Sequence, residues 1–237
     1  MKIALLGYGK MGKVIERIAQ ERGHEIVLKK EEFNSFDGLS SADVAIDFSA
    51  PNVAVENISM AINLGIPIVS GTTGWLSRYD EMVQLCEEKN GAFLYGSNFS
   101  LGVNLFFELN SYLAKLMTKF SEVYKISVEE IHHTQKLDSP SGTAISLANG
   151  IIENSKYTSW TEGIATQNQI HIEAKRINDI PGTHSVYYKS DVDFIEIKHV
   201  AHNREGFALG ALIASEWLIC KKGVFSMKDV LDLENRK

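Results

Sequence analysis

The sequence of 237 residues is poor in cysteine, has no excess of basic charge and lacks any long hydrophobic run. Its two cysteines, Cys86 and Cys220, stand far apart, so neither a disulfide framework nor a zinc site of cysteines is indicated. The net charge of −6 argues against a nucleic-acid partner. The longest apolar run near the start, "KIALLG", is far too short for a signal peptide or a membrane span. These absences predict a cytoplasmic protein with no membrane partner.

The first thirty residues contain a nucleotide-binding pattern. The apolar run at residues 2–7 predicts a buried strand, and "GYGKMG" then places Gly7, Gly9 and Gly12 in the spacing G-x-G-x-x-G ahead of a helical pattern. Gly7 permits a tight turn, Gly9 lets the backbone approach a pyrophosphate, and Gly12 lets the helix pack closely on the strand. The order of strand, motif and helix favours dinucleotide binding over a purely structural turn.

The second predicted strand, "HEIVLKK", ends in Lys29 and Lys30. Dinucleotide-binding proteins that use NADH commonly carry an acidic residue here for the ribose 2′-hydroxyl, whereas basic residues accommodate the 2′-phosphate of NADPH. The two lysines therefore favour the use of NADPH over NADH. A solvated charge cluster shared with Glu31 and Glu32 is an equally good interpretation.

Strands and helices continue to alternate up to about residue 98. The runs "ADVAIDFS", "IPIVSGTTGW" and "AFLYGSNFS" predict buried strands separated by amphipathic helices, which is typical of a doubly wound parallel sheet. Ligands of such sheets bind beyond the carboxyl ends of the strands. Three of these ends, residues 7–12, 71–73 and 96–98, consist mainly of small and polar residues, and we expect them to lie close to a cofactor.

The pattern changes after about residue 100. A long amphipathic helix, "GVNLFFELNSYLAKLMTKF", precedes several runs in which apolar and polar residues alternate, as in a sheet with one solvated face. We therefore predict an α/β protein in which a Rossmann-type domain precedes an α+β domain with an open mixed sheet. The first domain would cover residues 1–98, completed by residues 209–237, and the second would cover residues 99–208.

The stretch "VEEIHHTQKLDSPSGTAISLANG" concentrates titratable groups in the second domain. His132 and His133 end a predicted strand, so their side chains should point to opposite faces. Lys136 follows in the loop, where Asp138 could orient it or His132, or cap the turn. Adjacent histidines on a strand supply metal-ligand spacing poorly, so we expect no metal.

Ser141, Gly142 and Thr143 stand at the start of the helix that follows this loop. Hydroxyls and unpaired N–H groups at a helix N-terminus bind anions such as carboxylates. The stretch therefore predicts a pocket for an anionic small molecule with a His or Lys proton donor. The alternative is a capped helix after a loop, with one histidine buried in the core.

Six elements of the sequence together resemble the bacterial dihydrodipicolinate (4-hydroxy-tetrahydrodipicolinate) reductases. They are "GYGKMG", "DFS", "GTTGW", "GSNFSLGVN", "EEIHHTQKLDSPSGTA" and "GVFSMKDVLDL". The resemblance covers nearly the whole chain, and its most specific element is E-x-H-H-x-x-K-x-D-x-P-S-G-T-A. The chain departs from the family at Lys29 and Lys30, where an acidic residue followed by a basic one is usual.

The resemblance implies reduction of a cyclic dicarboxylate, 4-hydroxy-tetrahydrodipicolinate, with NADPH or NADH in lysine and diaminopimelate biosynthesis. It implies a homotetramer formed through the substrate domain. By motif position, His132 is the proton donor and acceptor, Lys136 is a second proton donor, and the substrate contacts are His133, Ser141, Gly142 and Thr143. Arg204 stands where the family has a basic residue near the pocket, as a carboxylate or structural contact. The implied cofactor contacts are Gly7, Tyr8, Gly9, Lys10, Met11, Gly12, Gly71, Thr72, Thr73, Gly96, Ser97, Asn98 and Phe99, and Lys29 and Lys30 are expected to join them from the end of the second strand.

Two other kinds of protein remain as alternatives. A different Rossmann oxidoreductase, acting on an amino-acid semialdehyde or an α-amino acid, would normally need a catalytic cysteine or a different site loop. Cys86 falls within a predicted helix, residues 76–90, and not at a strand end, which argues against the cysteine version. A nucleotide sensor without catalysis would have no use for His132 and Lys136 at their spacing.

Overall fold

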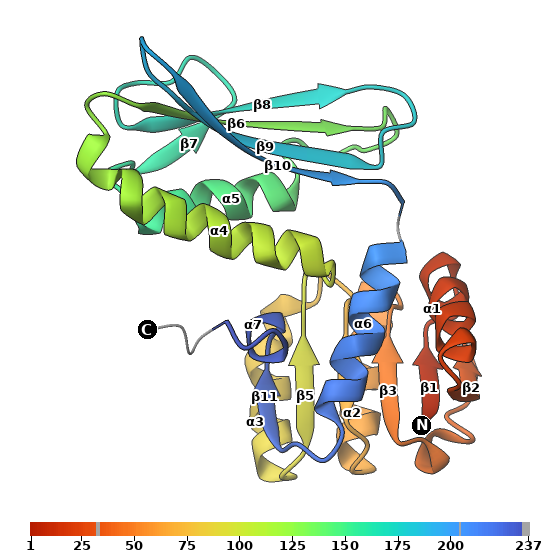
Figure 1. Cartoon of the computed structure of the whole chain (residues 1–237). Coiled ribbons are helices and arrows are strands. Elements are labelled where there is room, and N and C mark those ends of the chain that lie inside the picture. Colours follow the sequence, from red (N-terminus) through yellow and green to blue (C-terminus); the bar gives the residue numbers. More distant parts are fainter. Residues whose placement is uncertain (32–33, 204, 234–237) are drawn as a thin grey trace. The chain divides into compact units, whose positions relative to one another are not determined.

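The computed structural model describes residues 1–31, 34–203 and 205–233, and the chain divides into two compact units (Figure 1). The first unit comprises Met1–Leu101 and Glu205–Lys237, and the second comprises Gly102–Arg204. The second unit is thus inserted into the chain of the first. Among the described residues, no helix is both long and apolar enough to cross a bilayer.

The first unit contains a six-stranded sheet in the order β11-β5-β4-β3-β1-β2, in which all neighbouring strands are parallel. The strands are β1 (Lys2–Leu6), β2 (Glu25–Lys30), β3 (Val44–Asp47), β4 (Ile68–Ser70), β5 (Ala92–Tyr95) and β11 (Gly223–Phe225). Because all the strands run the same way, their carboxyl ends lie at one edge of the sheet. The residues expected at a cofactor site follow three of these strands, β1, β4 and β5, and end a fourth, β2.

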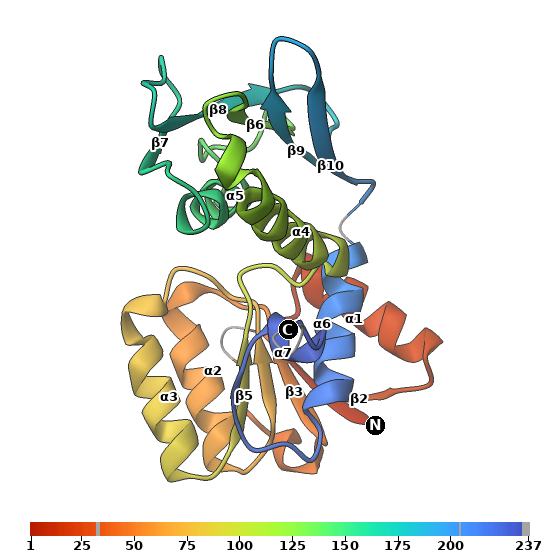
Figure 2. The ribbon, with the colours of Figure 1, turned by 60° about the vertical axis from the view of Figure 1, so that its left-hand side comes forward.

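Helices cover both faces of this sheet (Figure 2). The helices are α1 (Lys10–Glu21), α2 (Pro51–Asn63), α3 (Tyr79–Glu88), α6 (Glu205–Leu218) and α7 (Met227–Val230), with short 3₁₀ turns at Leu39–Ser41 and Leu76–Arg78. Apolar residues of α1 and α6 pack on one face in one core, and those of α2 and α3 pack on the other face in a second core. The predicted doubly wound Rossmann-type fold is therefore confirmed.

The second unit contains a five-stranded mixed sheet in the order β10-β9-β6-β8-β7. Its strands are β6 (Lys125–His132), β7 (Ser159–Thr161), β8 (Gln169–Arg176), β9 (Gly182–Lys189) and β10 (Phe194–Ala201). The pairs β6–β9 and β9–β10 are antiparallel, whereas β6–β8 and β7–β8 are parallel. The mixed sheet matches the predicted fold class.

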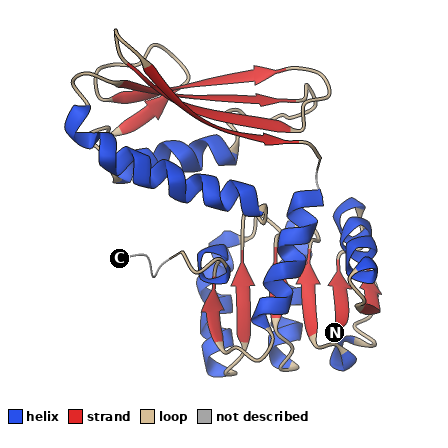
Figure 3. Cartoon of the chain, in the orientation of Figure 1, coloured by secondary structure: helices blue, strands red, loops and turns tan. Residues whose placement is uncertain are grey.

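Two helices, α4 (Leu101–Met117) and α5 (Gly142–Glu153), lie against one face of this sheet, and a 3₁₀ turn at Thr118–Phe120 follows α4 (Figure 3). Along β6 every second residue, including Val128 and Glu130, is buried, while its neighbours are partly or fully exposed. This alternation follows the period of two expected of a strand with one covered and one open face. It also decides which of the polar residues on β6 enter the interior.

Candidate functional site

The turn between β1 and α1 requires two of its three glycines. Gly7 has φ of 107°, and a Cβ there would lie 2.2 Å from the carbonyl oxygen of Phe48. A Cβ at Gly12 would lie 2.4 Å from the carbonyl oxygen of Gly7. At Gly9, by contrast, no other atom lies within 4 Å of a Cβ, and this residue precedes the first residue of α1. Gly9 therefore faces open space at a helix N-terminus, where a phosphate can approach the backbone.

A cavity of about 530 Å³ lies at this turn. It is lined from the ends of β1, β2 and β3 by Gly7, Tyr8, Gly9, Lys30, Glu31, Asn34, Phe48, Ser49, Ala50, Val53 and Asn57. The volume lies within the range of small-molecule and cofactor sites. Its position beyond the carboxyl ends of parallel strands is the usual one for a nucleotide.

The two lysines that end β2 have different surroundings. Lys29 is exposed, its Nζ lies 2.5 Å from a carboxylate oxygen of Glu16, and it lies 5.1 Å from the centre of the Tyr8 ring. Lys30 is 3% exposed, lies 4.7 Å from the centre of the Phe36 ring, and lines the cavity. Of the two, only Lys30 is placed to meet a ligand in the cavity.

Asp47, the last residue of β3, binds the neighbouring strand ends together. Its carboxylate is fully buried and accepts hydrogen bonds of 2.6–2.9 Å from Ser49 Oγ, Asn57 Nδ2, Ser70 Oγ and Thr72 Oγ1. Burial raises the pKa of this carboxyl although all four bonds favour its charged form. The network fixes two groups that line the cavity, Ser49 and Asn57, against the start of the loop after β4.

The remaining predicted cofactor residues lie at the same edge of the sheet. Gly71 packs so closely on Phe48 that a Cβ would lie 2.3 Å from its ring, and Gly96 packs similarly on the ring of Phe99 at 3.0 Å. Phe99 itself is buried in the core. Lys10 begins α1 with an exposed side chain, Met11 is partly buried beside it, Thr72 is buried, and Thr73, Ser97 and Asn98 are exposed or partly exposed. The close glycines, the cavity and the open N-terminus of α1 together fit a dinucleotide cofactor.

In the second unit, a buried carboxylate lies against the ring of His132. Glu130 is fully buried on β6, two residues before His132, and one of its oxygens contacts His132 Nδ1. Its other oxygen accepts hydrogen bonds from the backbone N–H of Ser141 at 3.0 Å and from Arg176 Nη2 at 3.1 Å. Burial opposes the charge of Glu130, but the bonds from His132 and Ser141 outweigh it and lower the pKa to about 2. The carboxylate is thus ionised and paired.

Lys136 lies in the loop between β6 and α5. Its Nζ lies 2.8 Å from both carboxylate oxygens of Asp138, as one of the sequence alternatives expected. Arg176 donates to the carbonyl oxygens of Lys136 and Asp138 at 3.3 and 2.6 Å, so it ties this loop to Glu130. The ammonium group of Lys136 is partly exposed and accessible to a small anion.

Ser141 is the N-cap of α5, and its Oγ accepts a hydrogen bond from the backbone N–H of Ala144 at 3.2 Å. Gly142 is exposed and Thr143 partly exposed in the first turn. A helix N-terminus carries partial positive charge and N–H groups without intrahelical partners. The first turn of α5 can therefore receive a carboxylate.

His184 of β9 completes the buried group. Its ring lies 5.0 Å from that of His132, and its Nε2 lies 3.1 Å from Ser141 Oγ. Burial, with the nearby charge of His132, lowers the pKa of His184 to about 3, so it is neutral at physiological pH.

Glu130, His132 and His184 offer possible metal-ligand atoms within 4.8 Å of one another. This cluster was not among the groups considered when the sequence was used to predict that no metal is bound. Electrostatics disfavours a divalent cation at this point, because the guanidinium of Arg176 already neutralises the carboxylate. The direct contact between Glu130 and His132 also leaves no space for an ion between them.

His133 is not brought into this group. It follows the last residue of β6 and lines a different cavity, of about 420 Å³, with residues that include Asn178, Pro181 and His202. Arg204, the other basic residue named from the sequence, lies outside the described residues. The structure thus joins His132, Ser141 and the Lys136 loop, and separates His133 from them.

Sequence reasoning did not assign roles to Glu130, Arg176 or His184. The spacing of Glu130 and His132, two residues apart on a strand, is the signal that could have placed both on one face. No comparable signal exists for Arg176 and His184, which reach the group through strand pairing over long sequence separations.

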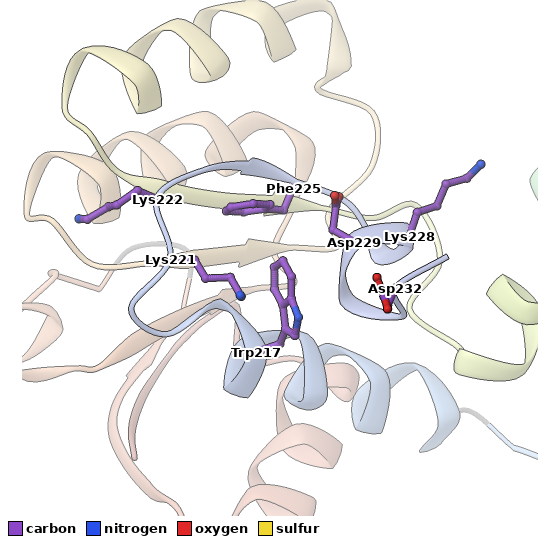
Figure 4. A pocket seen from close by; sticks show the side chains of 7 residues that line it. All are labelled: Trp217, Lys221, Lys222, Phe225, Lys228, Asp229 and Asp232. Atoms are coloured by element: carbon purple, nitrogen blue, oxygen red, sulfur yellow. The ribbon is translucent and has the colours of Figure 1, made fainter. Parts of the chain in front are cut away.

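A further cavity, of about 480 Å³, lies between the end of α6, β11 and α7 (Figure 4). Its groups take part in local structure: Lys221 stacks 4.1 Å from the centre of the Trp217 ring, Trp217 packs edge-on against Phe225, and Asp229 belongs to the capping box of α7. None of the predicted site residues lines it.

Cys86 is a poor candidate for a nucleophile. It lies within α3, its side chain is fully buried, and burial raises the pKa of the thiol. A reactive cysteine needs the opposite, an accessible thiolate. The alternative of a cysteine-dependent dehydrogenase therefore finds no support at this residue.

Comparisons with known proteins agree along the whole chain. Residues 1–99 match the family "Dihydrodipicolinate reductase, N-terminus", and residues 102–231 match "Dihydrodipicolinate reductase, C-terminus". A 4-hydroxy-tetrahydrodipicolinate reductase of Christiangramia forsetii is 52% identical over 98% of both chains. One from Methanosarcina barkeri is 37% identical over 95% of this chain and 83% of its own.

Among solved structures, a dipicolinate-bound dihydrodipicolinate reductase from Paenisporosarcina sp. TG-14 has the same fold. The TM-score is 0.74 with 20% sequence identity, covering 95% of this chain and 97% of the other.

Proposed function

The chain belongs to the dihydrodipicolinate reductase family, and from this premise we propose how its residues perform the reaction. It is an NAD(P)H-dependent oxidoreductase that reduces 4-hydroxy-tetrahydrodipicolinate to tetrahydrodipicolinate, a step of lysine and diaminopimelate biosynthesis. The observation that carries the assignment of residues is the buried contact of Glu130 with His132, beside the N-terminus of α5.

The first unit is the cofactor-binding domain in this proposal. The backbone at Gly9 and the N-terminus of α1 would receive the pyrophosphate, and Lys30, which lines the cavity, would bind a 2′-phosphate. The nicotinamide, when bound, supplies the hydride. Further contacts come from the edge of the sheet, at Gly7, Tyr8, Lys10, Met11, Gly12, Lys29, Gly71, Thr72, Thr73, Gly96, Ser97, Asn98 and Phe99.

The second unit is the substrate domain. A dicarboxylate needs positive partners in a chain of net charge −6, and Lys136 and the first turn of α5 supply them. Ser141, Gly142 and Thr143 would receive one carboxylate, and His133 remains a proposed contact from its separate cavity.

His132 supplies the proton that completes the reduction. Loss of water from the substrate produces a conjugated imine, and addition of the hydride leaves an electron-rich carbon that must take a proton. His132, with Nδ1 held by Glu130, can give this proton from Nε2, and Lys136 can serve as the second donor. Group by group, the substrate loses water and gains one hydride and one proton.

Turnover by variants tests this assignment. We expect His132→Asn and Lys136→Ala each to lower kcat about 100-fold or more, the usual contribution of a general acid, with substrate made in situ and NADPH consumption followed by absorbance. The matched control is Lys125→Ala, at the opposite end of β6, which should keep wild-type turnover. Wild-type turnover by His132→Asn would contradict the proposed role of this residue.

The assembly and location of the enzyme are part of the same proposal. A homotetramer formed through the second unit is supported by exposed apolar side chains on β10, its edge strand. The proposal places the enzyme in the cytoplasm with no nucleic-acid partner, as its acidic balance favours.

A further inference from the structure

Glu130 contacts His132 and Ser141 directly and reaches the loop of Lys136 through Arg176. It contacts His132 on its own strand, accepts the backbone N–H of the N-cap Ser141, and accepts from Arg176, which holds the loop of Lys136. Its side chain is fully buried. Burial of an ionised carboxylate costs free energy because the group loses its water, so its hydrogen bonds must compensate for this desolvation.

The contact with Glu130 defines which nitrogen of His132 is available. A carboxylate only accepts hydrogen bonds when ionised, so the nitrogen it touches, Nδ1, carries the proton. The other nitrogen, Nε2, lies near Gly182, where a Cβ would come within 3.1 Å of it. Glycine at 182 therefore leaves room around the nitrogen that exchanges the proton.

Arg176 extends this arrangement to the loop. Its guanidinium binds Glu130 through Nη2, and it also binds the carbonyl oxygens of Lys136 and Asp138. The donors are Nε and Nη2 of the planar guanidinium group, and the single ammonium group of a lysine cannot reproduce this arrangement. Arg176 comes from the end of β8, which pairs with the end of β6, so the sheet itself sets its position.

We propose that Glu130 and Arg176 are the positioning residues of this reductase. Glu130 orients the ring of His132, and Arg176 holds the carboxylate and the loop that presents Lys136. The proposal rests on the proposed role of His132 as proton donor, and it adds two residues that act through the groups touching substrate.

A double-mutant cycle tests the role of Glu130. We expect Glu130→Gln, which keeps the size and one acceptor, to lower kcat about tenfold or more in the wild-type background. In the His132→Asn background the same change should alter kcat by less than about twofold, because the group through which it acts is gone. The matched control is Glu129→Gln, the adjacent residue, which pairs with Lys175 and should keep wild-type kcat.

A comparison of kcat with KM separates positioning from folding. Glu130→Gln should lower kcat and leave the KM for the substrate within about twofold of the wild-type value, whereas a disturbed site would raise that KM as well. Unchanged NADPH affinity, measured by fluorescence, together with an unchanged circular dichroism spectrum, would confirm that the variant is folded. A loss of kcat that is equal in both backgrounds, or a KM for the substrate that rises as much as kcat falls, would overturn the proposal.

The cycle also separates this proposal from the proposed function. If His132→Asn retains wild-type turnover, the role of His132 as proton donor is wrong. If His132→Asn is impaired and Glu130→Gln acts independently of it, only the positioning role is wrong.

For Arg176, the corresponding cycle pairs Arg176→Lys with Lys136→Ala. We expect Arg176→Lys to lower kcat/KM about tenfold alone and by a smaller factor beside Lys136→Ala, where only its contact with Glu130 still acts. Lys175→Arg, one residue earlier on β8, is the control that should leave kcat/KM unchanged. Equal losses with and without Lys136 would show that Arg176 does not act through this loop.

Discussion

His184 has a depressed pKa whose effect on stability can be measured. Its pKa is about 3 in the folded chain because of burial and the nearby charge of His132, against about 6.5 when unfolded. As the pH falls below 6.5, His184 binds a proton in the unfolded chain but not in the folded chain, so the free energy of unfolding decreases. Between pH 7 and pH 5 this loss amounts to about 2 kcal/mol, since each unit is worth about 1.4 kcal/mol.

We therefore expect the unfolding free energy of His184→Asn to change less between pH 7 and pH 5 than that of the wild type, at equal protein concentration. Glu130, with a pKa of about 2 when folded, loses its contribution as the pH falls from its ordinary pKa of 4.5 towards 2, which is below this window. Burial also lowers the pKa of His199, but it does so in both proteins. Equal slopes in urea titrations of the two proteins would contradict the prediction.

Lys30 is the residue expected to decide the preference for NADPH. One charge-assisted bond to a 2′-phosphate is worth about 1.4 kcal/mol, or tenfold in affinity. Lys30→Gln should thus raise the KM for NADPH about tenfold and change that for NADH less than twofold. Lys29→Gln is the comparison variant: Lys29 pairs with Glu16 and does not line the cavity, so its loss should raise the KM for NADPH less than the loss of Lys30 does. Equal losses for both cofactors would assign Lys30 a role other than binding the phosphate.

Single residues also show how far sequence reasoning reached. Lys29 and Lys30 were considered as a pair, yet the alternation of β2 exposes one and buries the other. Glu129 and Glu130 are chemically identical neighbours, and only the pairing of β6 within the sheet decides which one enters the core. Identity and spacing suffice to nominate His132 and Lys136, but the burial that sets a residue's chemistry depends on partners far away in the chain.

At the level of elements, two glycines of the turn from β1 to α1 are expected to matter for different reasons. Gly7 is required by the backbone conformation, and Gly9 is expected to be required for cofactor binding. Gly7→Ala would place a Cβ 2.2 Å from a backbone oxygen at φ of 107°, so we expect a loss of stability of roughly 1–3 kcal/mol or more. Gly9→Ala meets no neighbouring atom; it should keep the wild-type Tm and weaken NADPH binding about tenfold.

Thermal unfolding and fluorescence titration of both variants measure these effects. Gly9→Ala is the matched control for Gly7→Ala, since the same methyl group is added two residues away. If Gly9→Ala bound NADPH like the wild type, the pyrophosphate would not approach the chain at this residue.

The elements that the sequence patterns predict are longer than those that they miss. Strands and helices with several periods, such as α1, α2 and β6, were predicted close to their observed positions. The three-residue strand β7 was not predicted, because three residues are too few to display a period. Strand β11 is equally short, and its residues were assigned only to a segment returning to the first domain.

For the whole molecule, we expect a tetramer in solution. Phe194 and Val200 on the edge strand β10 are 64% and 46% exposed in the single chain, and an edge strand with apolar side chains readily pairs with another chain. Light scattering coupled to gel filtration should give about four times the chain mass of 26.4 kDa. Phe194→Glu should reduce that mass, whereas Asp191→Asn in the preceding turn should not. A wild-type monomer at micromolar concentration would contradict the expectation.

The return of the chain to the first sheet has a consequence for protein synthesis. Strand β11 pairs with β5, and α6 supplies much of one of the two cores of the first unit, yet both follow the entire second unit in sequence. The inserted unit can therefore be fully synthesised while the first unit still lacks α6 and its last strand, β11. During translation, the apolar face that α6 will cover and the edge of β5 stay open to chaperones and to other nascent chains. Synthesis of β11, which comes long after the nucleotide-binding turn, therefore completes the sheet of the proposed cofactor-binding domain.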